Sequence, residues 1–194
     1  MSEGVEWAVH CCLTLAWLED DRPVSTARLA AGYELPPAYL NKQLQALAKA
    51  GILTSTPGVK GGFRLARPLD KITLMDVVTA IEGPDEAFQC TEIRQRGMGA
   101  EGPERRFRVP CAVASAMHRA ELAWRRALAA QTLADVRAEA EGHVPGLGEG
   151  IQRWYGRGAS TPSPAAPAGS ASAASRRPRA SRTSGASGAP PATG

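Results

Sequence analysis

The sequence predicts a mainly α-helical protein with one small β-hairpin. In several segments, apolar residues recur at three- and four-residue spacings, the period of an amphipathic helix. Two short segments around Pro57-Gly58 and Gly61-Gly62 instead have the pattern of strands joined by a turn. The chain has 194 residues, of which 43% are hydrophobic and 22% charged. This length is enough for one domain with a hydrophobic core and additional segments outside it.

The N-terminal region predicts one amphipathic helix and then a short second helix. The apolar residues of the first helix lie on one face at helical spacing: Val5, Ala8, Val9, Cys12, Leu13, Ala16 and Trp17. The acidic run 19–21 ends this helix before Pro23. Ser25 is expected to cap the second helix, Thr26–Ala31, which stops at Gly32.

A third helix, the hairpin and a fourth helix are expected next. Pro37 suits the first turn of the third helix, which ends at Gly51. The buried stripe expected on this helix consists of Tyr39, Leu40, Leu44 and Leu47. The strands of the hairpin are predicted over Ile52–Ser55 and Phe63–Ala66. Thr73 is expected to cap the fourth helix, Leu74–Ile81.

This order of elements is typical of a winged helix-turn-helix, and the charge distribution agrees with it. The segment 39–69 contains no acid and five bases, Lys42, Lys49, Lys60, Arg64 and Arg67, whereas 1–21 contains five acids and no Lys or Arg. Positive charge therefore lies on the third helix and the hairpin, where a duplex backbone would bind. The alternative is a small helical domain with a solvated basic face, but the agreement of helix order and charge favours DNA binding.

Three further regions follow the DNA-binding domain predicted over residues 1–83. Residues 84–110 form a long polar loop, and helical periodicity resumes over Cys111–Ala140, whose apolar face is expected to pair with a second copy. We assign 111–155 to a dimerisation helix and C-terminal segment, and 156–194 to a disordered Ala/Ser/Pro/Arg tail. The five arginines of this tail exceed the net charge of +4, so residues 1–155 alone carry −1, and the total charge is no argument for DNA binding.

The cysteine content and hydropathy predict a soluble cytoplasmic protein. Four cysteines are too few for a disulfide scaffold, and the longest apolar run is too short to cross a membrane. No nucleophile–base constellation, phosphate loop or cofactor fingerprint indicates an enzyme, so no small-molecule substrate is expected. If the chain were purely a protein-interaction module, the concentration of basic residues on the third helix and the hairpin would be a coincidence.

The hairpin and the segments around it resemble the Rrf2 family of bacterial winged-helix regulators. The most specific matches are the run Gly61-Gly62-Phe63-Arg64-Leu65-Ala66-Arg67-Pro68 and the pair Glu82-Gly83. The resemblance implies a homodimeric transcriptional regulator, usually a repressor, whose dimerisation helix corresponds to residues 111–131. A two-fold dimer in turn matches palindromic half-sites on double-stranded DNA.

The commonest sensors of this family hold an iron–sulfur cluster with three closely spaced cysteines, and this chain has no such trio. Its loop keeps Cys90, and the next cysteine is Cys111. Glu6 and His10 are spaced i,i+4, so they project from the same helix face and suit a shared metal ion. Residues 6–12, 88–97 and 110–111 are similar to the RsrR-type branch of the family, which holds a 2Fe–2S cluster.

This resemblance implies a ligand set of Glu6 and His10 from one subunit and Cys90 and Cys111 from the other. Replacing thiolates by imidazole raises the reduction potential, which favours a one-electron redox switch of DNA affinity. The alternative is a cluster-free regulator that uses Cys90 and Cys111 as a thiol sensor or zinc site. The adjacent Cys11 and Cys12 are assigned to packing.

The DNA contacts are expected on the helix face opposite the buried leucines and at the preceding helix. Asn41 and Gln45 suit an adenine edge, and Lys42 suits a guanine or a phosphate. Tyr39 suits either the core or a phosphate. The full candidate set is Ser25, Thr26, Arg28, Ala38, Tyr39, Asn41, Lys42, Gln45 and, in the wing, Lys60.

Overall fold

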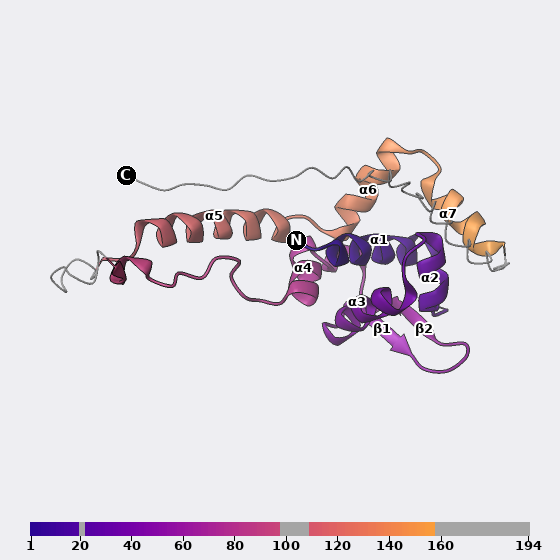
Figure 1. Ribbon diagram of the computed structural model, residues 1–194. Helices are drawn as coiled ribbons and strands as arrows, with labels where there is room; N and C mark the ends of the chain where they lie inside the picture. The colour runs from indigo at the N-terminus through magenta and orange to yellow at the C-terminus, as the bar shows by residue number, and fades with distance from the viewer. Residues whose placement is uncertain (20–21, 98–108, 158–194) are drawn as a thin grey trace, which may run out of the picture. The chain divides into compact units, whose positions relative to one another are not determined.

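Helices make up most of the computed structural model, which describes residues 1–19, 22–97 and 109–157 (Figure 1). Within these residues one two-stranded antiparallel sheet accompanies the helices, as the sequence predicts. The elements are α1 (Glu3–Leu18), α2 (Thr26–Gly32), α3 (Pro37–Lys49), β1 (Leu53–Thr56), β2 (Gly62–Leu65), η1 (Leu69–Lys71), α4 (Leu74–Glu82), η2 (Ile93–Gln95), α5 (Ala112–Ala129), α6 (Leu133–His143) and α7 (Leu147–Gly156). No described helix is long and apolar enough to cross a membrane.

The predicted caps are confirmed, and so is the buried stripe of α3 for its three leucines. Tyr39, predicted as part of that stripe, is instead 46% exposed, because its ring lies at the surface beside Trp7 of α1. Ser25 Oγ accepts a hydrogen bond of 3.3 Å from the backbone N–H of Arg28 and so caps α2. Thr73 caps α4 in a reciprocal capping box, in which its hydroxyl accepts from the Asp76 N–H and the Asp76 carboxylate accepts from its own N–H. The leucines of α3 are fully buried: Leu40, Leu44 and Leu47.

The hairpin lies within one residue of its predicted bounds and is pinned to the segment before α2. Leu53 pairs with Leu65 across the two strands, and Phe63 forms a bridge with Val24. A Cβ atom at Gly62 would come 2.3 Å from the Val24 carbonyl oxygen, so only glycine allows this approach. The wing is therefore fixed at its base by the packing of backbone on backbone.

The predicted continuous helix over Cys111–Ala140 is wrong, because it breaks between α5 and α6. The Leu74 N–H donates to the Gln131 carbonyl at 2.9 Å, and the Leu133 N–H donates to the Ile72 carbonyl at 2.8 Å. These bonds draw the chain out of the helix beside the start of α4 and bury Leu133 completely. Thr132 then starts α6 with a capping box of its own.

The two C-terminal helices pack against α1 of the same chain. Trp17 Nε1 donates to Glu141 Oε1 at 2.6 Å, and Gln152 Nε2 donates to the Trp17 carbonyl at 2.7 Å. Tyr155 of α7 is buried at 7% exposure. The segment assigned as C-terminal to the dimerisation helix therefore completes the core of the winged-helix unit.

Two of the predicted regions lie wholly or partly outside the described residues. Residues 98–108 of the predicted loop 84–110 are outside the described part of the chain. The expected disordered tail over 156–194 is outside it from residue 158 onward.

Candidate nucleic-acid interface and thiol pair

The face of α3 opposite its buried leucines is open to solvent. The candidate DNA-binding residues on this face are all exposed: Ala38, Tyr39, Asn41, Lys42 and Gln45. This follows from the helical period, since residues three or four apart share a face and the leucines occupy the other one. The exposed face therefore offers two amides and one ammonium group to a binding partner.

A hydrogen bond between α2 and α3 orients one of these amides. Thr26 Oγ1 donates to Asn41 Oδ1 at 3.1 Å, which leaves the Asn41 amide nitrogen directed away from Thr26. Lys60 is exposed in the turn between the two strands, and Arg28 is half-buried with its guanidinium carbon 5.4 Å from the centroid of the Tyr155 ring. Arg28 is thus partly engaged within the chain.

The position of Tyr39 combines the two roles that the sequence left open. Its ring lies edge-on to the ring of Trp7, with centroids 5.1 Å apart, yet 46% of the residue is exposed. One end of the side chain packs against α1 and the other faces solvent. The contact also joins the helix that bears Glu6 and His10 to the exposed face of α3.

The structure brings Cys90 and Cys111 together, although 20 residues separate them in the sequence. Cys111 is the N-cap residue of α5, and its thiol lies close enough to the Cys90 thiol for Cys90 to help lower its pKa. Cys90 is exposed and Cys111 partly exposed. The two thiols therefore form an accessible pair at the N-terminus of a helix.

The surroundings of Cys111 favour its thiolate. The backbone N–H groups at the start of α5, that of Ala114 foremost, lower the pKa of Cys111 below its usual value. None of them makes a capping hydrogen bond to the Cys111 side chain. The nearby positive charge of Arg94 and the Cys90 thiol act in the same direction, against partial burial. Arg94 is held in place by its ion pair with Glu92, including an Nη2–Oε2 bond of 2.8 Å, and by a bond of 3.2 Å to the Val109 carbonyl.

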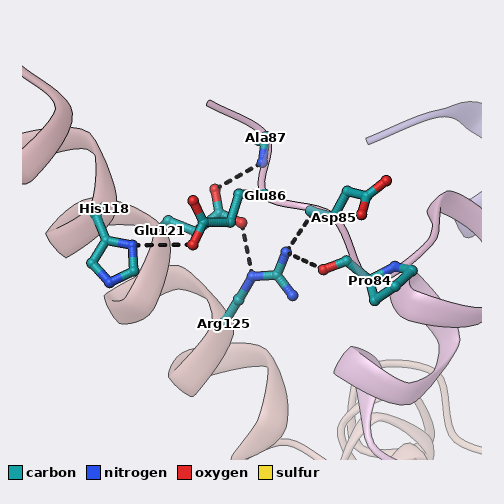
Figure 2. Close-up of polar contacts among 7 residues, drawn as sticks. All are labelled: Pro84, Asp85, Glu86, Ala87, His118, Glu121 and Arg125. Carbon is teal, nitrogen blue, oxygen red and sulfur yellow. Dashed lines mark hydrogen bonds and ion pairs between the residues drawn. The ribbon is translucent and has the colours of Figure 1, made fainter. Parts of the chain in front are cut away.

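Polar contacts fix the start of the loop that bears Cys90 against α5 (Figure 2). Arg125 Nη2 donates to the carbonyls of Pro84 at 3.2 Å and Asp85 at 2.7 Å, while its Nε donates to Glu121 Oε1 at 2.7 Å. Glu121 Oε2 also accepts from the Ala87 N–H at 3.3 Å. A second pair, His118 Nδ1 and Glu86 Oε1, are 3.2 Å apart.

Sequence reasoning missed Arg94 and this Glu121–Arg125 pair. The i,i+4 spacing of Glu121 and Arg125 is visible in the sequence, but it predicts only a surface ion pair. Their contacts with the loop, and the approach of Arg94 to the thiols, depend on how the loop returns to α5. No local pattern gives that path.

Glu6 and His10 lie one turn apart on α1, and both are exposed. The His10 ring lies 5.6 Å from the Tyr33 ring. Within the residues that the structure describes, no three His, Cys, Asp or Glu side chains of one chain converge as a metal site. One chain therefore presents two separate pairs, Glu6 with His10 and Cys90 with Cys111.

Cys11 and Cys12 differ sharply from that thiol pair. Both are fully buried on α1, and burial raises the pKa of Cys11 to about 12. Burial raises the pKa of Cys12 as well. They are packed in the hydrophobic core, as the sequence predicts.

The fold and exposed helix face define a winged-helix DNA-binding protein, and comparison with known proteins places it in a family. The Rrf2 family model, described as an iron-dependent transcriptional regulator, matches residues 1–139. A regulator of Lactococcus lactis, described as the putative HTH-type transcriptional regulator YffB, is 37% identical over 141 residues, 73% of this chain and 88% of that protein. The chain belongs to the Rrf2 family.

Solved structures show the same fold. IscR of T. potens is 22% identical with a TM-score of 0.55, covering 74% of this chain and 90% of that one. CymR, the global cysteine regulator of B. subtilis, is 24% identical with a TM-score of 0.53, covering 72% of this chain and 96% of that one. Six further curated relatives match over 53–58% of their own length.

These findings identify the protein as a transcriptional regulator with a DNA-binding fold. Its relatives are named as regulators and not as enzymes, in agreement with the prediction from sequence. The matches include IscR and NsrR as well as CymR, so family membership does not by itself decide whether this chain holds a cluster.

Proposed function

We propose that the protein is a cytoplasmic homodimeric repressor whose affinity for a palindromic operator changes when a 2Fe–2S cluster gains or loses one electron. Glu6 and His10 of one subunit, with Cys90 and Cys111 of the other, are the proposed ligands. The observation on which this rests is the thiol pair at the N-terminus of α5. Two adjacent thiols, one with a lowered pKa, have the chemistry that an iron–sulfur cluster requires, since thiolates are the ligands.

The separation of the two ligand pairs within one chain supports sharing of the ligands between subunits. Cys90 and Cys111 are together, Glu6 and His10 are together, and no described group of three potential ligands exists in a single chain. Two half-sites on one chain are complete when a second copy supplies the other half. Such a site would couple metal binding to dimerisation.

The apolar side chains of α5 support a dimer. None of its residues is buried, and two large apolar side chains one turn apart on the same face are markedly exposed: Val113 at 61% and Met117 at 43%. A helix that is amphipathic but unburied needs a partner for its apolar face. A second copy satisfies this need and places two copies of α3 for two half-sites.

The ligand set favours a redox switch. A 2Fe–2S cluster supplies one-electron chemistry, and a neutral imidazole in place of a thiolate makes its reduction easier. Within the chain, the Trp7–Tyr39 contact connects the helix of Glu6 and His10 to the exposed face of α3. A small displacement of α1 would therefore reach the DNA-binding helix directly.

A cluster-free regulator is the second candidate, and the closeness of the Cys90 and Cys111 thiols favours it specifically. Two thiols in contact can form a disulfide, with two electrons and two protons passing to an oxidant such as a peroxide. The same four side chains also suit zinc, which accepts cysteine, histidine and carboxylate ligands. Both versions keep the dimer and the DNA-binding face.

The decisive experiment combines a spectrum with a binding measurement. Full-length protein, purified anaerobically, is used to select duplexes from a random pool, and its affinity for the selected duplex is measured before and after reduction by dithionite. We expect visible absorption that bleaches reversibly and an affinity that differs at least about tenfold between the two states. The Cys111→Ala variant should lose both properties, whereas Cys12→Ala, with its cysteine in the core, should keep both.

Two results would contradict the proposal in different ways. A colourless protein that contains zinc, or one that responds to peroxide and not to dithionite, would support the cluster-free candidate. Coloured protein that binds the duplex equally well in both states would show that the cluster does not control DNA affinity.

The DNA-binding face is tested separately on the same duplex. Gln45→Ala should weaken binding about tenfold and relax base preference at one position of each half-site, because an amide reads a base edge. Lys42→Ala should weaken binding to all sequences alike and reduce its salt dependence if this residue contacts a phosphate. Equal behaviour of Gln45→Ala and wild type would remove α3 from base recognition.

A further inference from the structure

A cavity of about 560 Å³ lies between the end of α1, α2, the turn of the wing and α7. Three cationic side chains line it, Arg22 before α2, Arg28 of α2 and Lys60 of the wing, and none of the described lining residues is Asp or Glu. Most of the remaining wall is apolar: Leu18, Pro23, Val24 and Tyr155. The cavity therefore gathers positive charge against apolar surface, where the attraction for an anion is stronger than in open water.

Arg28 is the half-buried cation of this wall. Its guanidinium carbon lies 5.4 Å from the centroid of the Tyr155 ring, and no carboxylate of a described residue pairs with it. The ring attracts the positive charge, but it does not accept hydrogen bonds from the guanidinium N–H groups as an oxygen does. A cation that is partly withdrawn from water is costly unless an anion pairs with it. The Tyr155 ring thus positions a guanidinium whose donors suit an oxyanion.

Lys60 lies in a turn whose backbone geometry is fixed. The Gly61 N–H donates to the Gly58 carbonyl at 2.9 Å, and a Cβ atom at Gly61 would come 2.1 Å from the Thr56 carbonyl oxygen. The chain after the turn is hydrogen-bonded to Val24, which is itself part of the cavity wall. No carboxylate of a described residue pairs with Lys60. The turn therefore holds a second uncompensated cation at the same cavity.

We propose that this cavity binds one phosphate group between Arg28 and Lys60, supplied either by the backbone of the operator or by a free phosphate anion. A phosphate offers two oxygens to the fork of a guanidinium and further oxygens to an ammonium group. The first source deepens the proposed DNA binding and rests on it, because both cations are candidate DNA contacts. What is new is that they hold the same phosphate, in a cavity that the C-terminal helix α7 helps to form. None of the proposed cluster ligands lines this cavity.

The salt dependence of DNA binding tests the first source. The affinity of the full-length protein for the selected duplex is measured over a series of salt concentrations for wild type, Arg28→Gln, Lys60→Gln and the double variant. The slope of log affinity against log salt concentration falls by about 0.9 for each phosphate contact that is lost. If both cations hold one phosphate, the double variant should lose about 0.9 per subunit, whereas two separate phosphates would give about 1.8. Arg153→Gln removes one charge from an exposed site on α7 outside the cavity wall and should leave the slope unchanged.

Inorganic phosphate tests the second source on protein without DNA. Its binding is measured by titration calorimetry at constant ionic strength, with chloride as the balancing anion. If the cavity takes a free anion, Arg28→Gln should weaken the binding of phosphate at least about tenfold, whereas Arg153→Gln should bind it as wild type does. Circular dichroism and thermal unfolding establish that each variant is folded.

A single phosphate shared by Arg28 and Lys60 on the duplex supports the proposal with DNA as the source, and phosphate bound to DNA-free protein through Arg28 supports it with a free anion as the source. The proposal is overturned if the double variant loses about 1.8 per subunit, or no more than Arg153→Gln loses, and inorganic phosphate binds wild type and Arg28→Gln alike or not at all. If the selection yields no duplex, the proposed regulator fails, and the calorimetry alone then decides whether the cavity binds phosphate.

Discussion

The chain contains two pairs of cysteines whose surroundings could hardly differ more. Cys11 and Cys12 lie side by side on α1, fully buried, and burial raises the pKa of both. Cys90 and Cys111 are distant in sequence but meet at the N-terminus of α5, where backbone N–H groups lower the pKa of Cys111. The contrast shows that adjacency in sequence does not determine the chemistry of a thiol, whereas a helix N-terminus and a nearby arginine lower its pKa.

The largest expected effect follows from removing single ligands. Glu6→Ala, His10→Ala, Cys90→Ala and Cys111→Ala should each remove most of the iron and the visible absorption of purified protein, because each leaves a coordination position empty. Iron analysis and absorption spectroscopy measure this. Glu3→Ala and Cys12→Ala, neighbours on α1 that we exclude from the ligand set, should keep the wild-type iron content. Loss of iron in Cys12→Ala would break the distinction between the two cysteine pairs, and loss of iron in Glu3→Ala would contradict the choice of Glu6 as the carboxylate ligand.

Alkylation of metal-free protein gives the next largest difference. With a pKa of about 12, Cys11 has a thiolate fraction roughly a thousand times smaller than that of an ordinary thiol, and burial also blocks the reagent. The rate at Cys111 should rise with pH and level off above its pKa, at a lower pH than for free cysteine. Mass spectrometry after timed exposure to iodoacetamide gives the rates. If the alkylation rate of Cys111 levels off at the same pH as that of free cysteine, or at a higher pH, the lowered pKa is contradicted.

Serine substitution distinguishes the pairs by stability. Cys12→Ser places a hydroxyl at a site with 0% exposure, which should lower the free energy of unfolding by about 1–3 kcal/mol. Cys90→Ser is at an exposed site and should change it by less than about 0.5 kcal/mol in metal-free protein. Urea unfolding followed by circular dichroism measures both. Equal costs would mean that Cys90 is buried in the folded protein.

The smallest expected effect concerns Arg94. Arg94→Gln removes a positive charge near Cys111 and should raise the pKa of that thiol only slightly, because the backbone N–H groups at the start of α5 remain the main cause of its lowering. Arg96→Gln, exposed in the same loop, is the matched control. The pH dependence of alkylation at Cys111 reports both. If Arg96→Gln shifts the pKa of Cys111 more than Arg94→Gln does, Arg94 is not the arginine that acts on this thiol.

Most of the winged-helix unit was predictable because its signals are local. The leucines of α3, the caps at Ser25 and Thr73 and the glycines of the hairpin each act through neighbours within a few residues. The break before α6 also had a local signal, since Thr132 and Asp135 repeat the pattern of Thr73 and Asp76. However, apolar residues continue at helical spacing past this signal to Ala140, and this spacing favoured one continuous helix.

The candidate site was less predictable because its geometry is not local. The pairing of Cys90 with Cys111 depends on the return of a loop to α5, which Arg125 fixes through backbone carbonyls that any sequence possesses. Likewise, Arg94 approaches the thiols only through that fold. The burial of Gln43 at 6% exposure, beneath Gly4 of α1, was also missed, because a polar residue on the third helix predicts an exposed position.

The central claim is that two subunits complete one metal site, and mixed dimers test it most directly. The double variants Glu6→Ala/His10→Ala and Cys90→Ala/Cys111→Ala should each lack iron alone. Co-expressed with different tags and purified as the heterodimer, they contain one complete set of ligands only if the two pairs meet across the interface. The account predicts that the heterodimer recovers about half of the wild-type iron and visible absorption. A heterodimer that remains colourless and iron-free would contradict it.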